Sequence, residues 1–380
     1  MPNDTFTIAA KVFSTPNLSR VTIVIPTLGR PEFVERQIAY WSNSQAKIII
    51  LDGSKEKITR DSFPLNITYV HQTNGFLQRL RTATGMVNTE FVALLADDEF
   101  FLKSGIEDAV QFLDANVQTI GCVGRCLYFF VDQGRFLVSH AYRDWKPFPS
   151  QRDDLGMRLD ADLPPNKTHM AMYGIYRCEA WQKMFSRAYA VQFSCGYVYE
   201  RLLNLQRTIL GKTEIIESLV WMRSKENPPV VHSDIPRTLG RDFVSWATLP
   251  EFVDETLEYQ KVALKILVEG GLDKVQATEA LHRFFSGGVE RQSAKEKNSR
   301  KKLLPKIGRA VINYSPRQIR LFCKRHIPTR YLRFTGWEGH EISVALRSLK
   351  QLGTKFDETE IEWIVQAALK SDNVVTNIVS

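Results

Sequence analysis

The stretch that decides the fold runs from Val21 to Trp41 and reads VTIVIPTLGRPEFVERQIAYW. Its first six residues, 21–26, are a β-branched run closed by proline, which predicts a buried strand. Pro31 suits the first turn of a helix, because its missing N–H and fixed φ cost nothing there. Apolar residues at positions 34, 38 and 41 then give that helix one apolar face. The stretch therefore predicts a strand, a short loop and a helix.

The same alternation of strand and helix continues down the chain. Further apolar strands are predicted at 47–51, 67–70 and 91–96. A helix is expected to end near Val87, and another to begin at Ser104, where Glu107 completes a capping-box pattern. The strands are continuous apolar runs, which indicates burial on both faces. We therefore expect an α/β fold, a Rossmann-type, mostly parallel sheet sandwiched by helices.

The rest of the chain divides into an irregular middle and a helical end. In the middle, strands are predicted at 122–131, 136–141, 169–176 and 214–222, and helices at 179–188 and 196–210. After about Pro250 strand signals almost vanish, and helical periodicity marks 252–268, 275–285, 318–325, 341–352 and 360–369. We expect an α/β domain over 1–249, with halves at about 20–130 and 131–249, followed by a mainly helical region over 250–380.

Composition excludes several classes of protein. The 380-residue chain is 44% hydrophobic and 24% charged, which is close to the globular average and excludes a disordered or fibrous protein. Its longest apolar runs are a few residues, whereas a membrane-spanning helix needs about 20. No secretory signal is visible at the start of the sequence. The five cysteines form no CxxC pair, which argues against a disulfide framework or zinc ribbon and predicts a cytoplasmic location.

Acidic residues follow two of the predicted strands. Asp52 ends the second strand, and Asp97, Asp98 and Glu99 end the fourth. In an open α/β sheet, ligands bind beyond the C-terminal ends of the strands. Adjacent carboxylates repel one another and need a counter-charge, which Mg²⁺ bridging diphosphate oxygens would supply. An acidic turn or helix N-cap in solvent is the alternative.

Three segments resemble the N-terminal half of a family 2 glycosyltransferase with the GT-A fold. They are VTIVIPTLGRPEFVERQI at 21–38, KIIILDGS at 47–54 and TEFVALLADDEFFLKSGIEDAVQFL at 89–113. The resemblance covers roughly residues 21–130. It implies a GT-A-like sheet, a nucleotide-sugar donor, Mn²⁺ or Mg²⁺, and an inverting transfer to a hydroxyl of a glycan or lipid-linked acceptor. Such a reaction fits the synthesis of a bacterial surface polysaccharide.

The resemblance also implies which residues bind the donor. Asp52 would contact the base, and Asp97 would lie near the ribose. Arg79 lies on the helix where the family carries a basic residue near the diphosphate, with a solvent-exposed arginine as the alternative. The whole donor-binding set is Pro26, Thr27, Arg30, Asp52, Gly53, Arg79 and Asp97.

The metal ligand that the resemblance implies is open between two acids. Asp97, Asp98 and Glu99 occupy the position of the DxD motif, whose last acid holds the metal. In strict register this acid is Glu99, and if the register begins at Ala96 it is Asp98. His232, in a proline-rich loop after the last predicted strand, is a candidate further ligand, with an ordinary loop histidine as the alternative.

An inverting transfer needs a carboxylate that takes the proton of the acceptor hydroxyl. The resemblance places this base on the helix expected over 196–210, where Glu200 is the catalytic candidate. Glu200 points away from the apolar stripe of that helix, which suits a cleft and equally an exposed face. Asp242 is the second candidate.

A basic segment lies near the C-terminal end. Between 291 and 333 the chain carries fourteen Lys or Arg and one acid, although the net charge of the whole chain is only +8. Basic residues flanking an apolar stripe favour an anionic membrane surface, here the inner face of the plasma membrane. Nucleic acid ranks lower because no helix-turn-helix, zinc-finger or RNP signature is present. A solvated face or an oligomer contact is the alternative, and the oligomeric state stays open.

Two other functions compete with glycosyl transfer. A sugar nucleotidyltransferase would share the sheet and pocket but requires a glycine-rich loop after the first strand, where 27–31 has one glycine. A non-enzymatic nucleic-acid-binding protein would use the basic segment and would leave the acids at 97–99 unexplained. We therefore expect a metal-dependent inverting glycosyltransferase.

Overall fold

A computed structural model gives the fold of the chain. It describes residues 15–132, 134–140, 153–162, 170–188, 191, 193–225, 246–247, 249–283 and 340–378. Within these residues, ten strands form one sheet. The predicted α/β sheet with helices on both faces is confirmed.

The N-terminal half of the sheet is parallel. Strand β1 pairs with β2 and β4, and β2 pairs with β3, in the order β3-β2-β1-β4. The strands and the helices between them are β1 (Val21–Thr27), α1 (Pro31–Trp41), β2 (Lys47–Asp52), β3 (Ile67–His71), α2 (Phe76–Met86), β4 (Phe91–Leu94) and α3 (Lys103–Ala115). The register sets Thr27 beside Asp52, so the carboxyl ends of β1 and β2 lie together.

The second half of the sheet is mostly antiparallel. β8 lies antiparallel between β4 and β6, and β6 also pairs with β7 and, in parallel, with β9. The remaining strands are β5 (Phe100–Phe101), β6 (Thr119–Asp132), β7 (Arg135–His140), β8 (Ile175–Arg177), β9 (Lys212–Ser224) and β10 (His340–Glu341). β5 pairs with β9, which brings the chain just after residue 99 against the second half.

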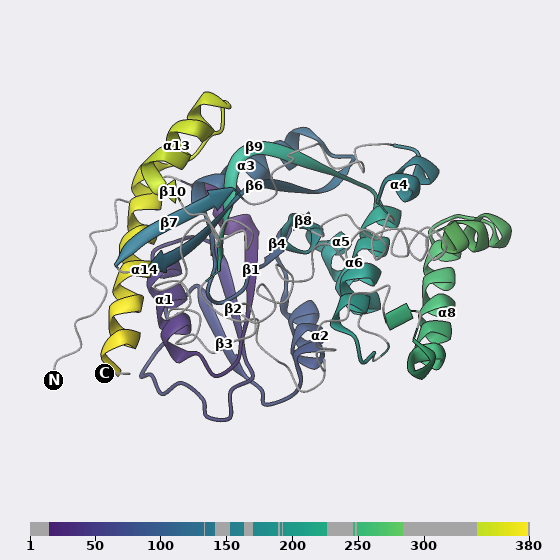
Figure 1. The fold of residues 1–380 in the computed structure, drawn as a ribbon, viewed down its shortest axis with the longest axis horizontal. Coiled ribbons are helices and arrows are strands. Elements are labelled where there is room, and N and C mark those ends of the chain that lie inside the picture. Colours follow the sequence, from purple (N-terminus) through teal and green to yellow (C-terminus); the bar gives the residue numbers. More distant parts are fainter. Residues whose placement is uncertain are drawn as a thin grey trace, which may run out of the picture.

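The side chains of the strands divide between two cores. Along β1, Ile23 and Ile25 enter one core and Val24 enters the other, because successive side chains of a strand point to opposite faces. The first core is covered by α1, α3, α13 (Ile342–Gln351) and α14 (Glu358–Ile378). The second is covered by α2, α5 (Cys178–Ala188) and α6 (Gly196–Leu210). Figure 1 shows these two layers on either side of the sheet.

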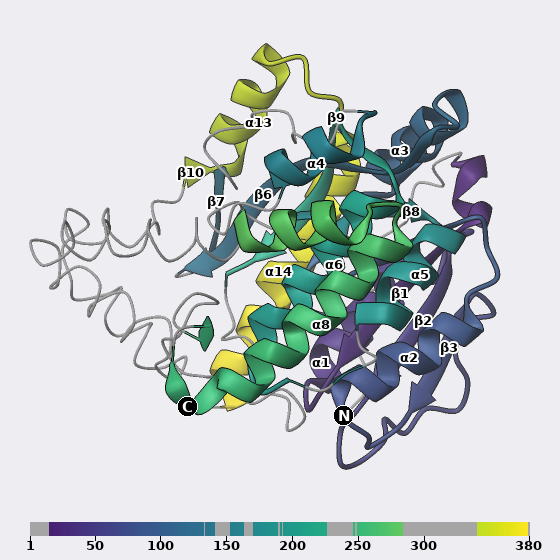
Figure 2. The same cartoon turned by 90° about the vertical axis from the view of Figure 1, so that its right-hand side faces the viewer.

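The C-terminal region is helical in the part that the structure describes, apart from β10. Helix α8 (Val253–Glu269) packs on α6 and lies outside it in Figure 2. A further helix spans 274–283. β10 pairs with β7, and α13 and α14 pack against the first core. None of the described helices is long and apolar enough to cross a membrane. The predicted helix at 318–325 and the basic segment 291–333 lie outside the described residues.

Two local predictions are wrong. The strand predicted at 169–176 is a short 3-10 helix, Met170–Tyr173, followed by the three-residue β8. The capping box at Ser104 and Glu107 does not form, because Leu102 is the N-cap and makes no side-chain cap. Glu360 from α14 accepts hydrogen bonds from the first N–H groups of α3 instead. A carboxylate distant in sequence therefore does the work of the local cap.

Candidate active site

The three acids at 97–99 form a buried turn between β4 and β5, here called the acidic turn. Asp97 is 0% exposed, Asp98 8% and Glu99 4%. Burying a carboxylate is costly unless it is paired and hydrogen-bonded. The partners of the acidic turn therefore define the site.

The first partners of the acidic turn come from the end of β1 and the loop after it. Thr27 Oγ1 donates to Asp97 Oδ2 at 2.6 Å, and Arg30 Nε donates to the same oxygen at 3.1 Å. Arg30 Nη2 also pairs with Asp97 Oδ1, and its Nη1 lies 3.3 Å from Asp98 Oδ2. Arg30 therefore spans the first two acids while its side chain stays 18% exposed.

The third acid has different partners, from the end of β9. Trp221 Nε1 donates to Glu99 Oε2 at 2.8 Å, and Arg223 Nε lies 3.3 Å from Glu99 Oε1. The acidic turn is thus held by one arginine on each side. Arg30 holds the side of β1, and Arg223 holds the side of the second half of the sheet.

Burial dominates the protonation of the acidic turn. It raises the pKa of Asp97 to about 7, against the opposing charge of Arg30 and with an added contribution from Asp98. It raises the pKa of Glu99 to about 8, against Arg223. Both values lie well above those of free carboxyl groups, as is common at functional sites.

The end of β2 lies beside the end of β1, where the register pairs Asp52 with Thr27. Asp52 is 1% exposed and accepts from Ser54 N at 2.8 Å, from Ser54 Oγ, and from Tyr69 Oη at 2.5 Å. Ser54 Oγ also accepts from Gly29 N at 2.7 Å. The loops after β1 and β2 are therefore tied together beside Asp52. Phe63 stacks on Tyr69 with centroids 4.8 Å apart and holds the phenol in place.

Arg79 is not a solvent-exposed arginine. It is 1% exposed, and its Nη1 donates to Thr27 O at 2.6 Å and to Leu51 O at 2.8 Å. Its guanidinium occupies the space where a Cβ on Gly53 would lie. Arg79 thus joins the carboxyl ends of β1 and β2 through their backbone carbonyl groups. Its contact with a diphosphate stays a prediction.

Glu200 lies on α6 and is half-buried. Burial raises the pKa of Glu200, while the charges of Arg223 and Arg201 lower it. Burial also raises the pKa of Tyr173, and Glu99 and Glu200 both add to that effect. The charge of Arg223 thus acts on both Glu99 and Glu200, and these three residues are here called the Glu200 neighbourhood.

Arg223 is the centre of that neighbourhood, and the sequence analysis missed it. Its guanidinium lies 5.1 Å from the Trp221 ring centroid, 5.6 Å from that of Tyr128 and 5.8 Å from that of Tyr173. Its side chain is 34% exposed. The signal was available, because Arg223 follows the apolar run 219–222 near the end of β9, just as Asp52 follows the apolar run of β2.

The three carboxylates of the acidic turn do not converge on one point. Among the described residues, no group of three or more His, Cys, Asp or Glu side chains is placed to hold a metal ion. Glu99 is engaged by Trp221 and Arg223 and is a poor ligand. Asp98 fits better, because Mg²⁺ typically takes one or two carboxylates and completes its shell with phosphate and water.

The remaining predicted site residues are Pro26, His232 and Asp242. Pro26 is half-buried near the end of β1, beside Leu51 of β2. His232 and Asp242 lie outside the described residues. The structure thus gathers Thr27, Arg30, Asp97 and Asp98 at the carboxyl end of β1, with Asp52 beside them. It gathers Glu99 and Glu200 around Arg223.

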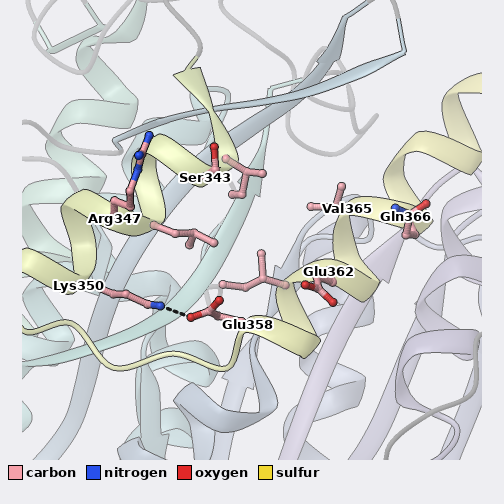
Figure 3. Close-up of a pocket in the computed structure, with 10 residues that line it drawn as sticks. Ser343, Arg347, Lys350, Glu358, Glu362, Val365 and Gln366 are labelled. Atoms are coloured by element: carbon pink, nitrogen blue, oxygen red, sulfur yellow. Dashed lines mark ion pairs between the residues drawn. The ribbon is translucent and has the colours of Figure 1, made fainter.

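A groove of about 510 Å³ lies elsewhere, between α13 and α14 (Figure 3). Leu346, Ile361 and Val365 supply apolar lining, and an ion pair joins Lys350 and Glu358. None of its lining residues belongs to the acidic turn or to the strand ends. The groove is therefore separate from the candidate active site.

Comparisons with known proteins complete the description of the site. No protein-family model matches the chain, and no curated protein matches it. Among solved structures, S. aureus TarS 1–349 is 10% identical with a TM-score of 0.48, covering 94% of this chain and 91% of that one. The same protein in complex with UDP-GlcNAc is 11% identical with a TM-score of 0.46, covering 94% and 92%. Likeness at this level does not carry a function over to this chain.

Proposed function

We propose that the chain is a metal-dependent inverting glycosyltransferase that uses a nucleotide-sugar donor. One observation carries the proposal: the acidic turn lies at the carboxyl edge of the parallel strands, joined to β1 through Thr27 and to the Glu200 neighbourhood through Arg223. Ligands of open α/β sheets bind at this edge. A group-transfer site needs a donor side and an acceptor side. We assign the Arg30 side of the turn to the donor and the Arg223 side to the acceptor.

On the donor side, Asp52 and Gly53 would meet the base, with Pro26 and Thr27 lining the nucleotide pocket. Asp52 is suited to this role because Ser54 and Tyr69 fix both of its oxygens. Arg30 pairs with Asp97 and Asp98 and keeps 18% of its side chain exposed, and it would offset charge that develops on the leaving diphosphate.

A divalent cation, Mn²⁺ or Mg²⁺, would be held by Asp98 together with diphosphate oxygens. When bound, it would neutralise negative charge on the diphosphate. Asp97 is fully occupied by Thr27 and Arg30, which leaves it a positioning task near the ribose. A role for His232 as a further ligand is part of the same proposal.

On the acceptor side, Glu200 would act as the general base. It would accept the hydroxyl proton as the acceptor oxygen forms its bond to the anomeric carbon and the bond to the diphosphate breaks. A base is most effective when its pKa lies near the working pH, and burial moves the pKa of Glu200 upward, toward that range.

The finer assignments belong to the same proposal. They are membership of glycosyltransferase family 2, a glycan or lipid-linked acceptor, and a location on the cytoplasmic face of the plasma membrane. The polar groups of the described site favour an enzyme over a protein that only binds nucleic acid. The single glycine after β1 also disfavours a nucleotidyltransferase.

The decisive experiment measures donor turnover. UDP-, GDP-, CMP- and dTDP-sugars are screened by thermal shift with Mn²⁺, with Mg²⁺ and with EDTA, and nucleotide release is then followed for the best binder. We expect sugars linked to one of these nucleotides to raise the Tm in the presence of metal. We also expect slow release of that nucleotide, by hydrolysis of the donor or by transfer of its sugar. No stabilisation and no release with any donor would contradict the proposal.

Substitutions then assign the roles. Glu200→Gln should keep donor binding and slow transfer by about 10²-fold or more, the usual contribution of a general base. Asp98→Asn should lose the metal-dependent part of donor binding. The control is Glu217→Gln on β9, whose exposed carboxylate pairs with Arg125 and whose loss should leave turnover unchanged.

A further inference from the structure

The backbone of the acidic turn is held from one side by helix α1. Gln37 Nε2 donates to Asp97 O at 3.0 Å and to Glu99 O at 2.6 Å. Arg36 Nη2 donates to Asp98 O at 2.8 Å. The carbonyl groups of all three residues of the turn therefore accept hydrogen bonds from two consecutive side chains of α1.

These two side chains are themselves fixed. Arg36 and Gln37 are each 0% exposed. Trp41 Nε1 donates to Gln37 Oε1 at 3.0 Å and so sets the orientation of the amide. The Arg36 guanidinium lies 4.6 Å from the ring centroid of Phe33 and 4.9 Å from that of Phe100. Neither donor can turn away without breaking a buried contact.

The arrangement has a geometric consequence. Three adjacent carboxylates repel one another, and a short turn without fixed carbonyls would relax by rotating its peptide planes. Fixing the carbonyls toward α1 fixes the peptide planes. The side-chain directions of the three acids then follow from the backbone, so Asp97 reaches Arg30 while Glu99 reaches Arg223.

We propose that Gln37 and Arg36 are positioning residues for the transfer reaction, because they hold the acidic turn in the one conformation that divides its carboxylates between the donor and acceptor sides. This inference rests on the proposed function for its kinetic consequence only. Arg36 also brings a buried positive charge under the turn. Neither residue contacts the reacting atoms.

The test compares two substitutions on α1. Gln37→Met keeps the size of the side chain and removes both donors to the turn. Tyr40→Phe is the matched control, because Tyr40 is also buried on α1 and its hydroxyl donates to Phe101 O and Glu360 Oε1, beyond the turn. Both variants should unfold at lower temperature than the wild type.

Two readouts separate positioning from stability. The first is hydrogen exchange of the Glu99 amide, which bonds to Ala96 O at 3.2 Å within the turn and needs no ligand to measure. The second is the kcat for donor turnover. In Gln37→Met we expect faster exchange at Glu99 and a kcat lower by about 10- to 100-fold, as a displacement of about 1 Å can produce. Tyr40→Phe should change neither.

The outcomes are distinct. Equal Glu99 exchange in both variants, or activity losses that only follow the loss of Tm, would overturn the inference. If Gln37→Met does not fold, Arg36→Lys tests the same point, because it keeps the charge and loses the bond to Asp98 O. If the wild type turns over no donor, the proposed function fails, and Glu99 exchange still decides whether α1 holds the turn.

Discussion

Glu360 on α14 offers a sharp test of how the C-terminal helix supports the fold. It is 3% exposed and accepts four hydrogen bonds. The donors are Lys103 N at 2.6 Å, Ser104 N at 3.2 Å, Ser104 Oγ at 2.8 Å and Tyr40 Oη at 2.6 Å. The first two are N–H groups at the start of α3, which have no partner within their own helix. The carboxylate thus caps α3 and joins it to α1 and α14.

The magnitude of a Glu360→Ala substitution follows from these contacts. Loss of an N-cap acceptor costs about 0.5–2 kcal/mol. Hydrogen bonds to a charged group contribute about 1.5–3 kcal/mol, and donors left unsatisfied in the interior add their desolvation cost. Release of the buried carboxylate offsets part of this sum. We expect a loss of about 3–5 kcal/mol, a large share of the roughly 5–15 kcal/mol that holds a typical domain together.

The assay is urea unfolding with hydrogen exchange at the amides of Lys103 and Ser104. Glu362→Ala is the control, because Glu362 lies on the same helix and is exposed, and such surface changes stay within about 0.5 kcal/mol. Glu360→Gln should fall between the two, since it keeps an oxygen acceptor and loses the charge. Equal midpoints for Glu360→Ala and Glu362→Ala would refute the reasoning.

Two more tests concern Gly53, just after β2, and Glu200 with Arg223. Gly53→Ala should destabilise the protein by about 1–3 kcal/mol, because the new methyl group overpacks against Arg79. Gly85→Ala in α2 is the control, because a Cβ there meets open space, and it should stabilise the protein by about 0.4–1 kcal/mol. Equal shifts in Tm for the two variants would contradict this. Because burial raises the pKa of Glu200 above its ordinary 4.5, the fall of activity with decreasing pH should have its midpoint above 4.5. Arg223→Met should move that limb to still higher pH, since Arg223 lowers the pKa, and an unmoved limb would assign the base elsewhere.

Much of the parallel half could be predicted because its signals are local. The strand predicted at 21–26 is β1 at Val21–Thr27, and the one predicted at 47–51 is β2 at Lys47–Asp52. Long apolar runs bounded by Pro, Gly or Asp state their own limits. The two-residue strand β5 was missed, because Phe100 and Phe101 form a strand only through pairing with β9.

The candidate site was also predicted only where its signals are local, and its long-range partners were missed. The rule that ligands bind at strand ends is local, and it found Asp52 and the acidic turn. The partners Arg223 and Gln37 act across long stretches of sequence, since Gln37 bonds to a carbonyl 60 residues away. The cap by Glu360 joins residues 256 positions apart. No periodicity in the sequence reports such contacts.

The two arginines also bear on how a cation and a donor would bind. Arg30 and Arg223 already compensate the acidic turn, so the fold does not need a metal ion to hold three acids together. A cation at Asp98 would have to share that carboxylate with Arg30. A diphosphate would resolve the competition, because its oxygens supply ligands to the cation and a new partner to Arg30. Under the proposed function, we therefore expect cation and donor to bind jointly rather than either alone.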